Sequence, residues 1–256
     1  IVPSVTDSGA DQSAIDAANA LLTQLQQAQA SAAQRLSEER AALEQPELLA
    51  VWSLRREDAP EWRALPELYR HLARRLLKLG LTPVAREVAR TAIELTVPDP
   101  VTKERPLWSG EETVELRQIL GLALARSGNT EDGQAVLLKL QEEGHVDEET
   151  LGMLARTYKD QAMQHPADDP QRRELLKLAS RQYREAYTRS GGFWTGINVA
   201  TVERLLGESA ESEKVARRVH AECLDELTQL QSERTPAEKC YWHLATLGEA
   251  ALNLGN

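Results

Sequence analysis

A recurring spacing of small residues around turn glycines is the feature that most constrains how this 256-residue chain can fold. In two stretches a small residue is followed after seven positions by a glycine, and after five more by another small residue: Ala73, Gly80 and Ala85, then Gly121, Gly128 and Gly133. Small residues let two helices approach closely, and a glycine between them adopts a left-handed backbone at low cost. The spacing therefore predicts pairs of helices joined by tight turns.

The same register recurs less regularly in three later stretches: 151–189, 194–232 and 238–255. In the last of them, Gly248 again stands seven residues before Gly255. This is the helix–turn–helix register of tetratricopeptide-like repeats, in which each pair stacks on the next. We expect an all-α, tetratricopeptide-like α-solenoid of helix–turn–helix repeats with a long N-terminal helix.

Composition agrees with this fold class and excludes several kinds of partner. Helix-forming residues dominate, aromatic residues make up only 4 %, and the net charge is −10. A strongly acidic chain is unsuited to non-specific binding of nucleic acid or of an anionic membrane. The two cysteines have no metal-ligand spacing, and we see neither a signal peptide nor an apolar run of the ~20 residues that a membrane span needs. We therefore expect a cytoplasmic protein without metal or cofactor.

The chain divides into three parts by pattern. Residues 1–12 form a polar, flexible arm, and residues 13–60 form an N-terminal helix over 13–44 with its connection. Residues 61–256 form the repeat domain. Apolar residues at steps of three and four along 13–44 give that helix one apolar face. Homo-oligomerisation through this face is one hypothesis. The helix at 238–255 has no following partner, so it is either a capping helix or, as we favour, the point where a longer array is cut, which would make the chain a fragment.

Motifs for catalysis are absent from the sequence. It has no glycine-rich phosphate loop, no HExxH and no GxSxG, and its five histidines are scattered without a nucleophile at relay spacing. We therefore expect that the chain is not an enzyme and has no catalytic residues.

One candidate binding motif is the stretch LARTYKD, 154–160. Arg156 and Lys159 stand three residues apart and share a helical face, which suits a phosphate or a carboxylate. The alternative is an ordinary charged helix face, in which Arg156 pairs with Asp160 four residues later.

A second candidate is the stretch GGFWTGIN, 191–198. Its glycines predict the end of one helix and the start of the next near Phe193. Trp194 could stack on a ring, while Thr195 and Asn198 could donate or accept hydrogen bonds. The alternative is a packing corner in which Asn198 bonds to the backbone.

Arg117 is a third candidate, because it lies on the first helix of its pair. First helices line the concave face of tetratricopeptide arrays. The alternative for Arg117 is an exposed, salt-bridging arginine.

Three motifs in this order resemble one family. Arg156–Asp160, Trp194–Asn198 and Tyr241–Trp242 are similar to stretches in the tetratricopeptide-like regulatory (TRAFs-binding) domain of the apoptosis signal-regulating kinases, and the wording is nearest its bacterial branch. The resemblance covers about residues 65–256 and not the helix at 13–44. It implies a regulatory scaffold that binds partners, and bacterial relatives that are modules of larger signalling or defence proteins, some proposed to sense nucleotide-derived signals. Kinase activity is not implied, because the kinase motifs are absent.

Two functions follow as expectations. The first is a non-catalytic regulatory scaffold that binds a protein partner on its concave face and passes the occupancy to an attached effector domain. The alternative is a receptor for an anionic, nucleotide-derived small molecule, held by Arg117, Arg156 and Lys159 and read by Trp194 and Asn198. The two differ in whether these side chains converge.

Overall fold

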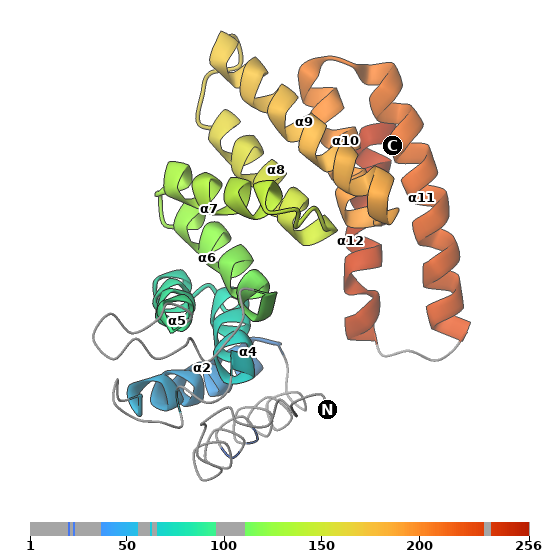
Figure 1. Cartoon of the computed structure of the whole chain (residues 1–256). Coiled ribbons are helices and arrows are strands. Elements are labelled where there is room, and N and C mark those ends of the chain that lie inside the picture. Colours follow the sequence, from blue (N-terminus) through green and yellow to red (C-terminus); the bar gives the residue numbers. More distant parts are fainter. Residues whose placement is uncertain are drawn as a thin grey trace, which may run out of the picture. The chain divides into compact units, whose positions relative to one another are not determined.

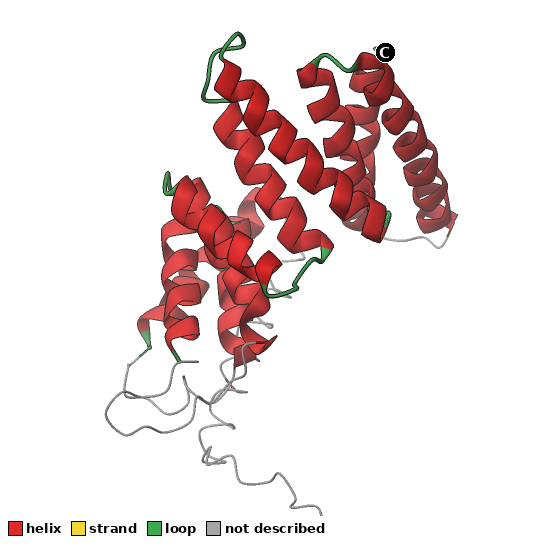
Figure 2. Cartoon of the chain, turned by 45° about the horizontal axis from the view of Figure 1, so that its top comes forward, coloured by secondary structure: helices red, strands yellow, loops and turns green. Residues whose placement is uncertain are grey.

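The computed structural model describes residues 37–55, 66–95, 111–232 and 237–255, together with the single positions 20, 23 and 62. Every regular element in these ranges is a helix (Figures 1 and 2). The elements are α2 (Ser37–Ser53), α4 (Pro66–Lys78), α5 (Thr82–Glu94), the 3-10 turn η1 (Glu111–Thr113), α6 (Val114–Arg126), α7 (Thr130–Glu142), α8 (Glu148–Ala162), α9 (Pro170–Ser190), α10 (Phe193–Leu206), α11 (Ser209–Ser232) and α12 (Ala237–Leu254). The predicted all-α, tetratricopeptide-like fold class is confirmed.

The chain forms two compact units, residues 1–136 and 137–256, and the boundary lies inside α7. In the first unit, α4 packs on α5 and both pack on α6, while α2 contacts α4. In the second unit, successive helices from α8 to α12 pack on one another, and α10 also contacts α8 and α12. The prediction that residues 61–256 form one repeat domain stays a prediction.

The turn glycines have the backbone that their spacing predicts. Gly80, Gly128 and Gly255 end helices with φ of 77°, 88° and 81°. Helices α6 and α7 also approach as closely as the small residues suggest, because a Cβ on Gly133 would lie 2.5 Å from the carbonyl oxygen of Gly121. The helix pair is therefore built around a contact that only glycine permits.

Helix α2 departs from the expected helix over 13–44. It runs from Ser37 to Ser53 and continues through Pro46, so the expected end at residue 44 is wrong. The reason is tertiary packing: Leu48, Val51 and Trp52 are all buried, and this burial extends the helix beyond the point where the sequence turns irregular. The arm at 1–12, most of the expected helix over 13–36 and the proline-rich stretch 97–109 lie outside the described residues. The oligomerisation hypothesis depends on the helix over 13–44, so it stays a prediction.

An aromatic cluster forms part of the core of the first unit. Trp52, Trp62 and Tyr69 meet edge to face, with ring centroids 5.7–6.4 Å apart. The same two helices are joined by an ion pair: the fully buried carboxylate of Glu44 on α2 accepts two hydrogen bonds of 2.6 Å from Arg75 on α4. Such a bidentate pair satisfies a charge that would otherwise be costly to bury.

Candidate functional site

The junction between α9 and α10 follows the sequence expectation for GGFWTGIN. Gly191 ends α9 with φ of 70°, and α10 begins at Phe193 after the cap residue Gly192. Within α10, Gly196 faces Val219 and Tyr187 so closely that a Cβ there would lie 2.7 Å from the valine. The glycines of this stretch thus serve helix termination and close packing.

Trp194 and Thr195 lie beside helix α8, in the same unit. A Cβ on Gly152 would lie 2.5 Å from the ring of Trp194, and this ring meets Tyr183 edge-on at 6.5 Å. Thr195 has no exposed surface, and its hydroxyl lies 2.8 Å from a carboxylate oxygen of Glu148. Trp194 remains partly exposed, whereas Thr195 belongs to the packing between the two helices.

Asn198 joins α10 to the predicted lysine on α8. Its Oδ1 accepts a hydrogen bond of 2.6 Å from Nζ of Lys159, and its Nδ2 donates one of 2.9 Å to the carbonyl oxygen of Trp194. Both ends of the amide are therefore used, one by the backbone, as the packing alternative expects, and one by a candidate binding residue.

The ammonium group of Lys159 lies in a poorly solvated position. Its Nζ stands 5.7 Å from the centre of the Tyr183 ring. Burial lowers the pKa of Lys159 and outweighs the opposite effect of Glu249 and Asp160, while Arg156 lowers that pKa further. In the described part of the chain the ammonium makes no ion pair, and its hydrogen-bond partner is the neutral amide of Asn198. A cation in such a position gains free energy when an anion reaches it.

A carboxylate from α12 is bound by a second polar residue of α10. Glu249 of α12 accepts a hydrogen bond of 2.6 Å from the hydroxyl of Thr201, and that hydroxyl accepts one of 3.0 Å from Asn253. Asn198 and Thr201 stand three residues apart and share one face of α10. One face of α10 therefore positions a cation from α8 and an anion from α12.

Glu249 is not among the candidate residues named from the sequence. A signal was nevertheless present, because Glu249 is the one acidic or basic residue in the stretch 240–254, if histidine is set aside. A lone carboxylate on a largely apolar helix is a stronger pointer than one in a charged run.

The two predicted arginines differ in position. Arg156 lies on α8 one turn before Lys159 and pairs with Asp160 at 3.4 Å, an exposed contact of the kind that stabilises little. Arg117 lies on α6 in the first unit. The structure thus brings Lys159, Asn198 and Trp194 together in the second unit, with Arg156 on the neighbouring turn. The part of Arg117 in the same site stays a prediction.

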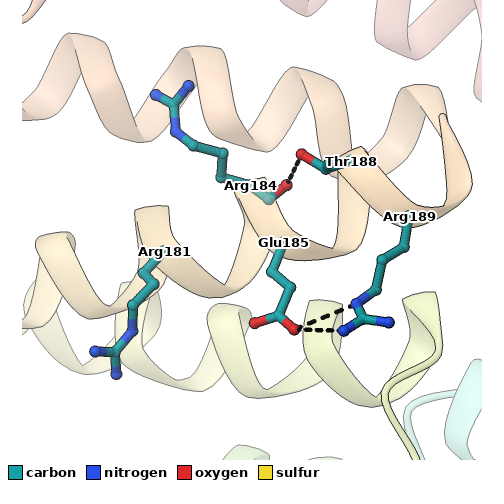
Figure 3. A pocket seen from close by; sticks show the side chains of 5 residues that line it. All are labelled: Arg181, Arg184, Glu185, Thr188 and Arg189. Carbon is teal, nitrogen blue, oxygen red and sulfur yellow. Dashed lines mark hydrogen bonds and ion pairs between the residues drawn. The ribbon is translucent and has the colours of Figure 1, made fainter.

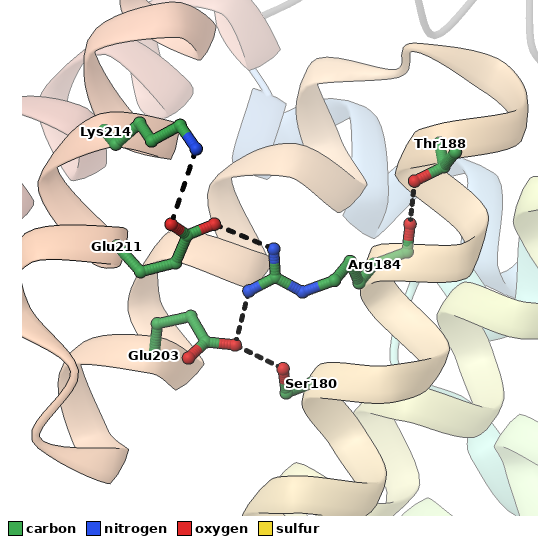
Figure 4. Close-up of polar contacts among 6 residues, drawn as sticks. All are labelled: Ser180, Arg184, Thr188, Glu203, Glu211 and Lys214. Carbon is green, nitrogen blue, oxygen red and sulfur yellow. Dashed lines mark hydrogen bonds and ion pairs between the residues drawn. The ribbon is translucent and has the colours of Figure 1, made fainter.

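A polar network elsewhere in the second unit connects α9, α10 and α11 (Figure 4). Arg184 donates to Glu203 at 2.8 Å and to Glu211 at 2.9 Å, and the largely buried Glu203 also accepts from Ser180. Every charge in this network has a partner, so we interpret it as a structural connection between helices.

A shallow hollow on α9 is lined by side chains of that one helix: Arg181, Arg184, Glu185, Thr188 and Arg189 (Figure 3). Two of its three arginines are already paired, Arg184 as above and Arg189 with Glu185. The hollow lacks a second wall among its lining residues and is a weaker candidate than the face around α10.

Neither a metal site nor a membrane span is found where the structure can be described. Those residues contain no group of three or more histidine, cysteine, aspartate or glutamate side chains that could hold a metal ion. The same residues include no helix that is both long and apolar enough to cross a bilayer.

One known family model matches part of the chain. Residues 84–203, from within α5 to within α10, match the family model described as Tetratricopeptide Repeats-Sensor, or TPR-S. The chain contains a tetratricopeptide-like domain. The TPR-S match includes Lys159 and Asn198 and ends before Glu249. A search of curated proteins finds no match, and the resemblance to the kinase TRAFs-binding domain stays a prediction.

Proposed function

We propose that the chain is a non-catalytic regulatory binding module of a larger signalling or defence protein. Its binding surface is the α8–α10–α12 face, which we define as Arg156, Lys159, Trp194, Asn198, Thr201 and Glu249. In this proposal the face receives a segment of a protein partner, and occupancy is passed to an attached effector domain. Tetratricopeptide-like domains generally mediate protein interactions and are typically non-catalytic, which supports the proposal.

The observation that carries the proposal is the hydrogen bonding on α10. Asn198 and Thr201 hold Lys159 and Glu249 at 2.6 Å each, although neither charged residue is in an ion pair where the structure can be described. A merely structural pair of opposite charges would gain more by direct contact. Side chains that are positioned by neutral groups and left without a counter-ion are suited to a partner's charges.

Selection of displayed peptides on the whole 256-residue chain tests this function. We expect enriched peptides whose dissociation constants rise at least tenfold in the variants Asn198→Ala and Thr201→Val. The matched controls are Arg181→Ala and Arg189→Ala on the α9 hollow, which we expect to leave binding unchanged. Peptides that bind equally well to the two α10 variants, or that lose binding with the α9 variants, would place the binding surface elsewhere.

A second candidate function is supported by Lys159 itself. A half-buried ammonium beside Arg156, with the partly exposed ring of Trp194 packed nearby, suits an anionic, nucleotide-derived small molecule that controls the effector domain. The word "Sensor" in the description of the TPR-S family is compatible with this function. A thermal-shift screen with nucleotides tests it: at a hundred times its Kd a ligand adds about 2.7 kcal/mol of stability, and no shift with any phosphate-bearing compound would count against a receptor.

A further inference from the structure

Lys159 and Glu249 form an unpaired set of opposite charges on the α8–α10–α12 face. They come from α8 and α12, which both contact α10 in addition to its chain neighbours α9 and α11. Each side chain is held by its own hydrogen bond to α10, through Asn198 or Thr201. Glu249 is close enough to raise the pKa of Lys159, yet the two do not reach ion-pair distance. The face therefore presents a positive point and a negative point that do not neutralise each other.

This arrangement discriminates between kinds of ligand. A ligand with only negative charge gains at Lys159 and is repelled by Glu249, and a ligand with only positive charge meets the reverse problem. Of the other charged groups nearby, Arg156 and Asp160 pair with each other on α8, so their opposite effects on Lys159 largely cancel, and Arg204 of α10 donates a hydrogen bond to the carbonyl oxygen of Asn253. A ligand that carries both charges gains at both points and meets no uncompensated repulsion.

We infer that the α8–α10–α12 face recognises a zwitterionic group, with a carboxylate or phosphate at Lys159 and an ammonium or guanidinium at Glu249. This inference rests on the proposed function and names the chemistry of its ligand. In a polypeptide, an acidic and a basic side chain two residues apart in an extended segment point the same way, roughly 7 Å apart. A small amino-acid-like molecule carries the same pair of charges.

Matched small probes separate this chemistry from simple anion binding. The probes are 6-aminohexanoate, which carries both charges, and hexanoate and hexylamine, which carry one each. Nuclear magnetic resonance titrations of the whole chain follow the side-chain amide of Asn198 and the indole of Trp194. We expect the Kd of 6-aminohexanoate to be at least tenfold lower than that of either single-charge probe. Equal Kd values for hexanoate and 6-aminohexanoate would overturn the inference.

Charge variants give a second, independent readout. We expect Lys159→Met and Glu249→Gln each to raise the Kd of 6-aminohexanoate at least tenfold, whereas Lys177→Met, an exposed lysine on α9, leaves it unchanged. In the double variant Lys159→Glu with Glu249→Lys, the probe can bind in the reversed direction, so we expect its Kd to return to within about threefold of the wild-type value. A double variant that folds, by circular dichroism, and yet stays as weak as the single variants would contradict the inference.

One more probe distinguishes a polypeptide ligand from a small-molecule ligand. Acetyl-Glu-Ala-Lys-amide carries the two charges on side chains and none at its ends. Tighter binding of this peptide than of 6-aminohexanoate indicates a polypeptide ligand, the reverse order indicates a small molecule, and weak binding of both overturns the inference. Failure of these probes leaves the proposed function standing if displayed peptides still bind through Asn198 and Thr201, so the two results are distinguishable.

Discussion

The ammonium nitrogen of Lys159 lies 2.6 Å from Oδ1 of Asn198, although 39 residues separate the two in the chain. This hydrogen bond joins α8 to α10 and holds a cation where water reaches it poorly. Its neutral partner does not offset the charge as a carboxylate would. A poorly solvated charge of this kind costs stability, so the effect of replacing it is measurable.

Replacement of Lys159 by methionine should stabilise the fold. Methionine keeps most of the side-chain volume and removes a poorly solvated charge, so we expect a gain of about 1 kcal/mol, or a rise in Tm of about 2–4 °C. Thermal and urea unfolding measure this gain. Lys177→Met is the control, with an expected change within about 0.5 kcal/mol because Lys177 is exposed. A loss of 1 kcal/mol or more in Lys159→Met would instead mark Lys159 as a structural residue.

Two glycines of the second unit should respond to alanine with opposite signs. A Cβ on Gly196 would lie 2.7 Å from Cγ2 of the fully buried Val219, so Gly196→Ala should cost about 1–3 kcal/mol by overpacking. A Cβ on Gly248 would meet nothing within 4 Å, so Gly248→Ala should add about 0.5–1 kcal/mol by favouring the helix. Urea denaturation of both variants measures the difference, and a similar change in the two would refute the close approach at Gly196.

The network around Arg184 should show strong coupling between its members. Arg184→Met leaves the carboxylate of Glu203, which is 7 % exposed, with Ser180 as its remaining hydrogen-bond partner in the network. Because Arg184 is itself partly exposed, we expect a loss of about 1–3 kcal/mol rather than the larger cost of a fully buried pair.

A double-mutant cycle with Glu203→Met checks this coupling. We expect the double variant to be less destabilised than the sum of the single variants, because no buried charge is then left alone. Arg217→Ala serves as the comparison, since its partner Glu213 is exposed and the pair stabilises little. Simple additivity of Arg184→Met and Glu203→Met would show that the two side chains do not depend on each other.

His71 on α4 should make the first unit less stable in acid. Burial, helped by Arg74 and Arg75, lowers the pKa of His71 below its ordinary 6.5, and its buried Nε2 has no hydrogen-bond partner among the described residues. The folded state therefore binds this proton less readily than the unfolded state. The contribution of neutral His71 is fully present above about pH 6.5 and is lost as the pH falls through that value towards the lowered pKa.

Urea midpoints at pH 7.5 and pH 5 for the wild type and His71→Gln isolate this contribution. His71 is only half-buried, so solvent screening limits the expected difference to a few tenths of a kcal/mol, at most about 1 kcal/mol. We expect the wild type to lose more stability on acidification than the variant. An equal loss in the two would assign the acid sensitivity to other groups.

The sequence by itself determined the helix pairs of this protein. The intervals from Gly121 to Gly128 and Gly133 act through local physics, because a left-handed turn and a close crossing depend on residues near one another in the chain. The break between α9 and α10 at Gly191 was predictable for the same reason. Arg156 and Lys159 could be proposed as binding residues because residues three apart share a helical face, and Asn198 because its amide can donate and accept hydrogen bonds.

Only the tertiary structure decided what surrounds those residues. Helix α2 continues past residue 44 because Leu48 and Trp52 are buried against the rest of the first unit. The tertiary structure placed Glu249 next to Thr201, although 48 residues separate the two in the chain. It also buried Thr195 between α10 and α8, where its hydroxyl contacts Glu148. The rotation of each helix about its axis and its contact with the next helix follow from the packing of whole side-chain surfaces. That packing, and not any local spacing, puts an unpaired cation and an unpaired anion on one face of the protein.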